Sequence, residues 1–164
     1  MENIFHRVSV RKYQDRTVEP EKVEQILRAA CAAPSAVNQQ PWEFYVVTDK
    51  GKLEELSGAH DYAKCTAKAP LAIVSCYRKN CVMPEFAPTD LAIATEHILL
   101  EADALGLGAV WLGIYPIEER MERVEKALSI PENLRAFALV PVGYPVKEKK
   151  QEDRFRPERI HYVG

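Results

Sequence analysis

The sequence predicts an α+β fold, in which helices cover a mixed central sheet to form a three-layer α/β/α sandwich. Segments with apolar residues at helical spacing alternate with short β-branched and aromatic runs, which are typical of strands. Hydrophobic residues make up 47% of the 164 residues, enough for a sizeable core, so a disordered chain is excluded. The 11 prolines and 7 glycines are spread along the chain, which excludes collagen-like and low-complexity sequences.

The first half of the chain predicts two helices and two strands. Residues 19 to 33 carry apolar side chains at positions i, i+3, i+4 and i+7, namely Val23, Ile26, Leu27 and Ala30. The aromatic and β-branched run from Trp42 to Thr48 predicts a strand. A short helix is expected from Lys50 to Ser57, and a buried strand over the apolar run from Pro70 to Tyr77.

The second half predicts the longest helix, two strands and a further helix. Residues 88 to 105 are apolar on nearly every side, so we expect a buried helix that also suits packing against a second subunit. Residues 109 to 114 and 137 to 142 are expected strands, and residues 116 to 128 an amphipathic helix. Gly106 to Trp111 follows a helix and lacks the third glycine of a dinucleotide fingerprint, so we interpret it as a helix C-cap.

The composition changes after Gly143. Residues 145 to 159 are mostly polar, and the chain closes with the strand-like tetrad from Ile160 to Val163. We therefore expect one domain over residues 1 to 164, in which residues 145 to 164 form a C-terminal arm that adds to a sheet edge on another subunit. The alternative is a frayed C-terminus.

Charge and cysteine content narrow the class of protein. The 22 Lys and Arg against 24 Asp and Glu leave a formal charge of −2, which predicts no nucleic-acid or anionic membrane partner. No apolar run is long enough for a membrane span or a signal peptide, so a reduced, cytoplasmic protein is expected. Cys31 and Cys76 are expected to be buried thiols, and His97 a hydrogen-bonded core residue. No metal-ligand spacing and no nucleophile motif is present in the sequence, so no metal is expected.

Three polar segments are candidates for ligand binding. Arg7 to Arg11 places two guanidinium groups and the hydroxyl of Ser9 within five residues, which suits a phosphate group. Residues 34 to 42 carry uncharged donors and acceptors between a helix and a strand, which suit the carbonyls and hydroxyls of a heterocycle. Residues 153 to 156 add a second pair of arginines.

These segments together carry a resemblance to a known family. The motifs R-x-S-x-R, P-S-x-x-N-x-Q-P-W, G-L-G-x-x-W-L-G-x-x-P and D-R-F…R-I-H-Y follow one another from Arg7 to Tyr162. In this order and spacing they resemble the FMN-dependent nitroreductase family, of which this chain looks like a short member. The resemblance covers nearly the whole chain.

The resemblance implies roles for individual residues. It places Arg7, Val8 and Ser9 at the FMN phosphate and ribityl chain, Arg11 at the N1–C2=O edge of the isoalloxazine, and Arg154 and Arg156 at the phosphate. It places Pro34, Ser35, Ala36, Asn38 and Gln40 against the flavin of the other subunit of a homodimer, and the backbone of Leu112 and Gly113 near flavin N5. Val8 and Ala36 depart from the residues usual in the family, and residues 78 to 88 match no pattern.

The implied activity is that of an FMN-dependent oxidoreductase. It would take hydride from NAD(P)H onto flavin N5 and reduce a small organic acceptor, of nitroaromatic or quinone type, by a ping-pong mechanism. No catalytic side chain is expected, because flavin N5 is the reactive centre and Arg11 gives only electrostatic support. The alternative is a flavin-binding module without turnover, such as a flavin store, a sensor or an electron-transfer partner.

Overall fold

The computed structural model describes residues 3–148 and 150–164, and its centre is a five-stranded sheet. The strands are β1 (Trp42–Val47), β2 (Leu71–Arg78), β3 (Gly108–Ala109), β4 (Leu112–Gly113) and β5 (Leu134–Gly143). Their order is β1-β2-β5-β3, and β4 also pairs with β5. These strands pair antiparallel, and a parallel bridge between Ser9 and Ala109 adds the N-terminal segment beside β3.

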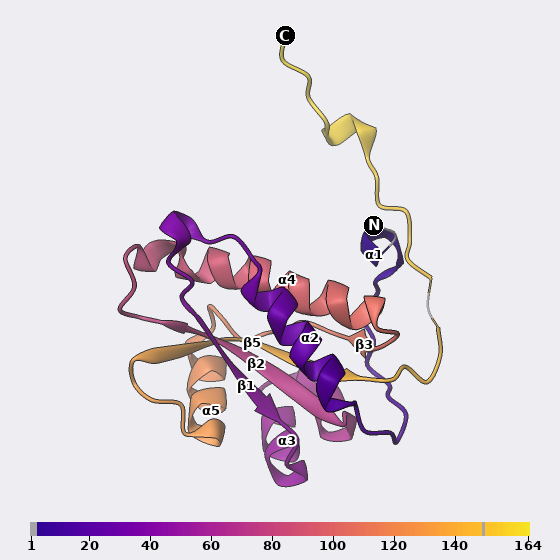
Figure 1. The fold of residues 1–164 in the computed structure, drawn as a ribbon, viewed down its shortest axis with the longest axis vertical. Coiled ribbons are helices and arrows are strands. Elements are labelled where there is room, and N and C mark those ends of the chain that lie inside the picture. Colours follow the sequence, from indigo (N-terminus) through magenta and orange to yellow (C-terminus); the bar gives the residue numbers. More distant parts are fainter. Residues whose placement is uncertain (1–2, 149) are drawn as a thin grey trace.

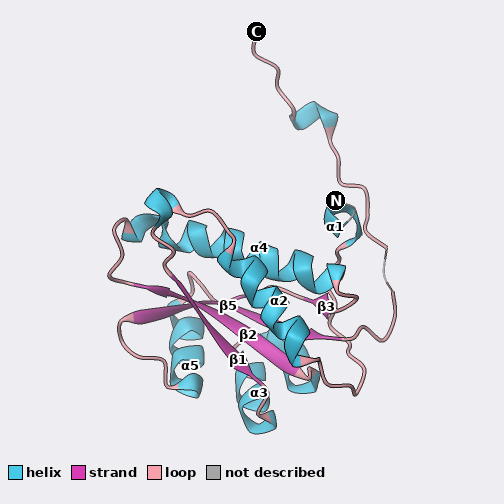
Figure 2. Cartoon of the chain, viewed as in Figure 1, coloured by secondary structure: helices cyan, strands magenta, loops and turns pink. Residues whose placement is uncertain are grey.

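Helices cover both faces of this sheet (Figures 1 and 2). The α-helices are α1 (Asn3–His6), α2 (Pro20–Cys31), α3 (Lys50–Ser57), α4 (Ala87–Ala104) and α5 (Glu118–Leu128). Short 3-10 helices are η1 (Ala36–Asn38), η2 (Asp61–Lys68), η3 (Pro84–Phe86) and η4 (Pro157–Arg159). In Figure 1, α2 and α4 lie on one face of the sheet, and α3 and α5 lie on the other. The predicted three-layer sandwich is confirmed.

Two apolar clusters separate these layers. On one face, Ile26 of α2 and Ile98 of α4 pack with Ile73 of β2. On the other face, Leu53 of α3 and Met121 of α5 pack with Val74, the next residue of β2, in a second cluster. Consecutive residues of a strand point to opposite faces, so a strand covered on both sides is apolar at every position. This explains why the run that forms β2 shows no alternation.

The predicted elements form with small shifts at their ends. The strand expected over residues 109 to 114 is interrupted, because β3 and β4 keep one antiparallel register with β5 while Val110 and Trp111 between them are unassigned. Gly106 has φ 73° and follows the last turn of α4, which confirms the C-cap. His97 lies on α4 with its Nδ1 2.9 Å from the Ala29 carbonyl of α2, so the predicted hydrogen bond is present, but the residue is half-buried and not part of the core.

Two expectations differ from the structure. Cys31 is exposed, because it is the last residue of α2 and follows the core-facing Ala30, whereas Cys76 in β2 is buried as predicted. Residues 160 to 163 form no strand in the single chain; the arm extends away from the sheet, and Tyr162 is 94% exposed (Figure 1). Whether the arm pairs with another subunit stays a prediction.

None of the helices within the described ranges combines the length and the apolar character that crossing a bilayer requires.

Candidate functional site

The N-terminal basic segment, residues 7 to 11, lies beside the first part of the C-terminal arm, residues 150 to 154, which we call the arm root. Together they line a cavity of about 340 Å³, whose lining residues are Arg7, Val8, Ser9, Arg11, Lys150, Gln151, Glu152 and Arg154. Four of these side chains are cationic and one is acidic, although the whole chain carries a formal charge of −2. Segments about 140 residues apart in sequence therefore build a local positive site.

The sequence of the basic segment explains which side chains face this cavity. Ser9 bridges to Ala109, and the Val10 amide donates to the Ala109 carbonyl at 2.9 Å, so the segment is extended along β3. Val10 is buried against Gly108, where an added Cβ would lie 2.6 Å from the valine Cβ. Because side chains alternate along extended backbone, burying Val10 turns Ser9 and Arg11 the other way, toward the cavity.

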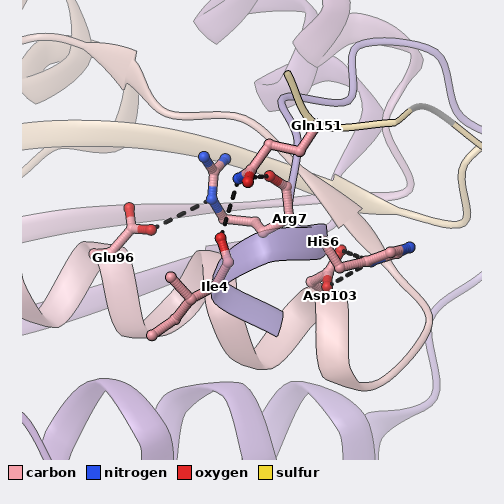
Figure 3. Close-up of polar contacts among 6 residues, drawn as sticks. All are labelled: Ile4, His6, Arg7, Glu96, Asp103 and Gln151. Carbon is pink, nitrogen blue, oxygen red and sulfur yellow. Dashed lines mark hydrogen bonds and ion pairs between the residues drawn. The ribbon is translucent and has the colours of Figure 1, made fainter. Parts of the chain in front are cut away.

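Ion pairs hold the N-terminal residues on α4, and hydrogen bonds hold the arm root on these N-terminal residues (Figure 3). Arg7 Nε lies 3.3 Å from Glu96 Oε1, and His6 Nδ1 lies 2.9 Å from Asp103 Oδ2. Gln151 Nε2 donates to the carbonyls of Ile4 and Arg7, each at 3.0 Å. Burial raises the pKa of Glu96, and the hydrogen bond to Asp103 raises the pKa of His6.

Most of the predicted phosphate-binding residues share this cavity. A phosphate ester carries close to two negative charges, which guanidinium groups neutralise with charge-assisted hydrogen bonds. Arg7 and Arg154 can supply these groups, and the Ser9 hydroxyl adds a neutral donor. Arg11, which is predicted at the flavin edge, lines the same cavity. Arg156 is the exception: its Nη1 donates to the Phe155 carbonyl at 2.9 Å, and it does not line the cavity.

The polar loop, residues 34 to 41, lies at the other end of α4 (Figure 1). The Ala36 amide donates to Oδ1 of Asp90 in the first turn of α4 at 2.9 Å, whereas the basic segment contacts Glu96 and Asp103 farther along the helix. No loop residue lines the cavity of the basic segment within the described part of the chain. One chain therefore does not bring the two predicted halves of the site together.

The loop is conformationally strained. Val37, Asn38 and Gln40 have φ values of 47°, 55° and 46°, in the left-handed region that favours glycine. Such conformations cost on the order of 1–3 kcal/mol each and persist only where the surroundings impose them. Inside the loop, the backbone amide of Gln40 donates to Ser35 Oγ at 2.9 Å, and the side-chain Nε2 of Gln40 donates to Asn38 Oδ1 at 3.2 Å.

These internal bonds leave a defined set of groups for a ligand. The Ser35 hydroxyl and the side-chain nitrogen of Asn38 can still donate a hydrogen bond, and the side-chain oxygen of Gln40 can still accept one. The pyrimidine edge of an isoalloxazine presents two carbonyl oxygens on either side of one N–H. The donors and the acceptor of the loop match that pattern.

The predicted backbone contacts near β4 are also open to a ligand. Leu112 is buried, so it can offer only backbone groups, and an added Cβ on Gly113 would meet no atom within 4 Å. The Gly113 carbonyl is already used by Arg120 Nη1 at 2.9 Å. A ligand at this position would therefore have to use the Gly113 amide.

Two of the cysteines and the possible metal ligands can be located in the described residues. Residues 3–148 and 150–164 contain no group of three or more His, Cys, Asp or Glu side chains placed to hold a metal ion. Burial raises the pKa of Cys65 and of Cys76, which disfavours the reactive thiolate. The positive charge of Arg11 acts against this shift at Cys65, so Arg11 lies near η2 as well as near the cavity.

Sequence reasoning missed four residues at these two places. Lys150, Gln151 and Glu152 line the cavity, but they stand in a polar tail without a spacing pattern that would single them out. The fourth is Asp90, one of several acidic residues on α4, which accepts from the side chain of Gln39. Gln39 belongs to the polar residues 34 to 42 that are expected to contact a ligand, but its bond to Asp90 is not foreseen by that expectation.

Comparison with known proteins places the chain in a family. A sequence model described as the nitroreductase family matches residues 4–78 and 54–144. A relative in Archaeoglobus fulgidus, provisionally named NADH dehydrogenase/NAD(P)H nitroreductase, is 46% identical over 163 residues, 96% of this chain and 94% of the relative. A relative of the same name in Methanothermobacter thermautotrophicus is 44% identical over 162 residues, 98% of this chain and 85% of the relative.

Comparison with solved structures leads to the same family. A structure from Clostridium difficile named FMN-dependent nitroreductase superposes with a TM-score of 0.92 at 32% identity, covering 99% of this chain and 98% of that one. A Clostridium acetobutylicum structure provisionally named NADH oxidase has a TM-score of 0.94 at 46% identity, with 97% of both chains covered. The predicted family is confirmed, and this chain belongs to the nitroreductase family.

Proposed function

We propose that this chain is an FMN-dependent oxidoreductase that takes hydride from NAD(P)H and passes the electrons to a small organic acceptor, of nitroaromatic or quinone type, by a ping-pong mechanism. The observation that carries the proposal is the positive cavity in which Arg7, Ser9, Arg11 and Arg154 converge. The similar C. difficile structure is named FMN-dependent nitroreductase, and a 25% identical Bacillus subtilis relative is named FMN reductase.

Each residue of the cavity has a separate task in this proposal. Arg7 and Arg154 bind the FMN phosphate, with Lys150 as a further cation, and Ser9 donates to the ribityl chain. Arg7 exchanges its contact with Glu96 for the phosphate, because the dianion attracts the guanidinium more strongly than one carboxylate does. The arm root closes the cavity through Gln151, which is bonded to the Ile4 and Arg7 carbonyls.

When bound, FMN supplies the hydride chemistry at its N5. The protein places and polarises it. Arg11 carries a permanent positive charge, which would stabilise the negative charge that develops at the N1–C2=O edge on reduction. The Gly113 amide would donate near N5, and the acceptor binds without help from a protein acid or base.

A homodimer completes the site in this proposal. The polar loop lies at the far end of α4 from the cavity, so it would serve the flavin held by a second copy. The exposed apolar surface supports the same arrangement: Phe5, Phe155 and Val163 are 79%, 66% and 97% exposed. A hollow of about 440 Å³ lies between Ile4, Phe5 and arm residues 151 to 155, next to the basic segment.

Two measurements test the proposal. The purified protein should be yellow, and mass analysis of the released cofactor should find FMN; FAD or a colourless protein would contradict it. Bound FMN should then be bleached rapidly by NAD(P)H under anaerobic conditions and reoxidised by an added quinone. Bound FMN that NAD(P)H does not reduce would identify a flavin-binding module without turnover.

A further inference from the structure

We infer that Gln39 and Asp90 are positioning residues: they clamp the polar loop between α4 and residues 79 to 86, and so hold its flavin-facing groups in place before a ligand arrives. The inference rests on the proposed function. It also gives a role to residues 79 to 86, which no sequence motif explains.

The anchor of the clamp is a buried carboxylate. Asp90 is only 3% exposed, and both of its oxygens accept from the loop. Oδ1 accepts from the Ala36 amide at 2.9 Å, and Oδ2 accepts from Gln39 Nε2 at 2.7 Å. A buried charge is costly unless hydrogen bonds satisfy it, so Asp90 and the loop hold each other in one geometry.

Gln39 extends the clamp to the unexplained segment. Its Nε2 donates to the Met83 carbonyl at 3.0 Å, and its Oε1 accepts from the Met83 amide at 2.8 Å. This pair of bonds lets the side chain of Gln39 pair with the backbone of Met83 as a neighbouring strand would. Arg78, at the end of β2, closes the far side by donating from Nη2 to the Gln40 carbonyl at 2.6 Å.

The clamp explains how the loop sustains its strained backbone. Val37, a β-branched residue in the left-handed region, is 65% exposed, so packing within its own chain offsets little of the strain. The residues that make the clamp bonds flank it on both sides. The clamp thereby fixes the residues that the resemblance places at the flavin, and its bonds do not use the Ser35 hydroxyl, the side-chain nitrogen of Asn38 or the side-chain oxygen of Gln40.

Preorganisation of this kind acts on ligand affinity. A loop already held in its binding conformation loses less conformational freedom on binding, so the ligand binds more tightly. Without the clamp, the loop can relax to unstrained backbone and must be ordered again by FMN. We therefore expect clamp variants to weaken FMN binding although neither Gln39 nor Asp90 needs to touch it.

The first test is a titration of apoprotein with FMN, followed by quenching of flavin fluorescence. Gln39→Ala and Asp90→Asn should each weaken FMN binding about tenfold or more. Gln25→Ala, which removes an exposed glutamine of α2, is the matched control and should bind FMN as the wild type does. A wild-type protein that binds no FMN would overturn the proposed function and this inference with it. Wild-type affinity in both variants would overturn this inference alone.

A double variant tests the hydrogen bond itself. In Gln39→Glu two carboxylates oppose each other at the contact that is now 2.7 Å, and the donor to the Met83 carbonyl is lost as well. Combining it with Asp90→Asn lets the new amide nitrogen donate to that carboxylate, while the Met83 amide stays bonded. The double variant should therefore bind FMN more tightly than Gln39→Glu alone. Binding no tighter than that of Gln39→Glu would contradict the assigned contact.

Val37→Gly separates positioning from stability and does not depend on the clamp variants folding. Glycine relieves the left-handed strain, so the unfolding temperature of the apoprotein should stay level or rise. The looser loop should at the same time bind FMN several-fold more weakly. If stability and affinity instead rise together, or affinity does not change, the loop is not preorganised and the inference fails.

Discussion

The two predicted halves of the site are built in opposite ways. The polar loop is uncharged, strained and fixed by short hydrogen bonds to a buried carboxylate. The basic segment and the arm root are charged and unstrained, and they are held by contacts such as Arg7–Glu96 that a stronger anion can replace. The conformation of the loop is therefore fixed by contacts within one chain, whereas the arginines of the basic site can exchange their present ion-pair partners for a ligand.

This contrast fits what each half would bind. A heterocycle edge is recognised by hydrogen bonds of fixed direction, which require a rigid frame. A phosphate is recognised mainly by charge, which tolerates mobile side chains and a long arm. The following predictions test whether the halves differ in this way, and whether both belong to one site.

The largest expected effect comes from removing the arm. A chain that ends at Val146 keeps the whole sheet and the bond from the Val146 amide to the Lys12 carbonyl, so it should fold. It loses Arg154, Lys150 and the exposed apolar side chains of the arm. We expect a monomer that binds FMN at least about a hundredfold more weakly, since one charge-assisted hydrogen bond alone is worth about 1.5–3 kcal/mol. Light scattering and FMN titration measure the two effects.

A milder variant shows which feature of the arm matters. Ile160→Ser combined with Val163→Ser keeps every cation but removes apolar surface near the end of the chain. If the arm works by joining subunits, this variant should also dissociate. A truncated protein that stays dimeric and keeps its FMN would refute the role of the arm.

Next in size is the loss of one phosphate ligand. Arg7→Ala should weaken FMN binding by about 1.5–3 kcal/mol, roughly tenfold to 150-fold. Arg28→Ala is the matched control, because Arg28 is an exposed arginine of α2 paired with Glu24. An FMN dissociation constant that stays at the wild-type value in Arg7→Ala would exclude this arginine from the phosphate site.

Mixed dimers test whether the two halves of one site come from different chains. A subunit with Arg7→Ala is combined with a subunit with Asn38→Ala, and the mixed dimer is isolated with two affinity tags. If the loop serves the flavin of the partner, both lesions fall in one site, and one normal FMN site per dimer should remain. Two equally weakened sites would mean that the loop acts within its own chain.

A smaller effect, on redox behaviour more than on binding, is expected for Arg11. Arg11→Gln keeps a donor but removes the positive charge, so the midpoint potential of the flavin should fall and reduction by NAD(P)H should slow on the order of tenfold. Potentiometry and stopped-flow reduction of FMN-saturated protein measure this. If Arg11 only paired with a nearby acid such as Asp15, stability would change while both redox values stayed the same.

Much of the fold was predictable, because the apolar pattern reports burial directly. The helix at residues 50 to 57 and the strand at residues 42 to 47 lie within two residues of their predicted ends. The exposed Cys31 shows the limit: an apolar neighbourhood in sequence does not say on which side of a helix end a residue lies. The 3-10 helix over residues 61 to 68 was missed, because its buried residues are Ala63 and Thr66, a small and a polar side chain that give no strongly apolar period.

The site was predictable only in part. The motif around Arg7 and Ser9 identified side chains that do share a cavity, since alternation along extended backbone turns them the same way. Arg156 matched the pattern equally well, yet it lies outside the cavity in the single chain. Asp90 escaped notice because its contact with Gln39 joins residues 51 positions apart, a pairing that depends on how α4 packs and leaves no local signal.

The smallest effect should come from the pair that fastens α1, beside the basic segment, to α4. His6 Nδ1 lies 2.9 Å from Asp103, which raises the pKa of the imidazole above its ordinary value of 6.5. Because the folded-state pKa is the higher one, the contribution to stability is complete below about pH 6.5 and is lost as the pH rises through the raised value. His6→Asn should therefore lower the unfolding temperature of the apoprotein slightly at about pH 5.5 and not at about pH 9. His161→Asn, at an exposed position of the arm, is the control and should show no such dependence on pH. A difference between wild type and His6→Asn that is equal at both pH values would mean that packing of α1, and not the ion pair, holds the basic segment on α4.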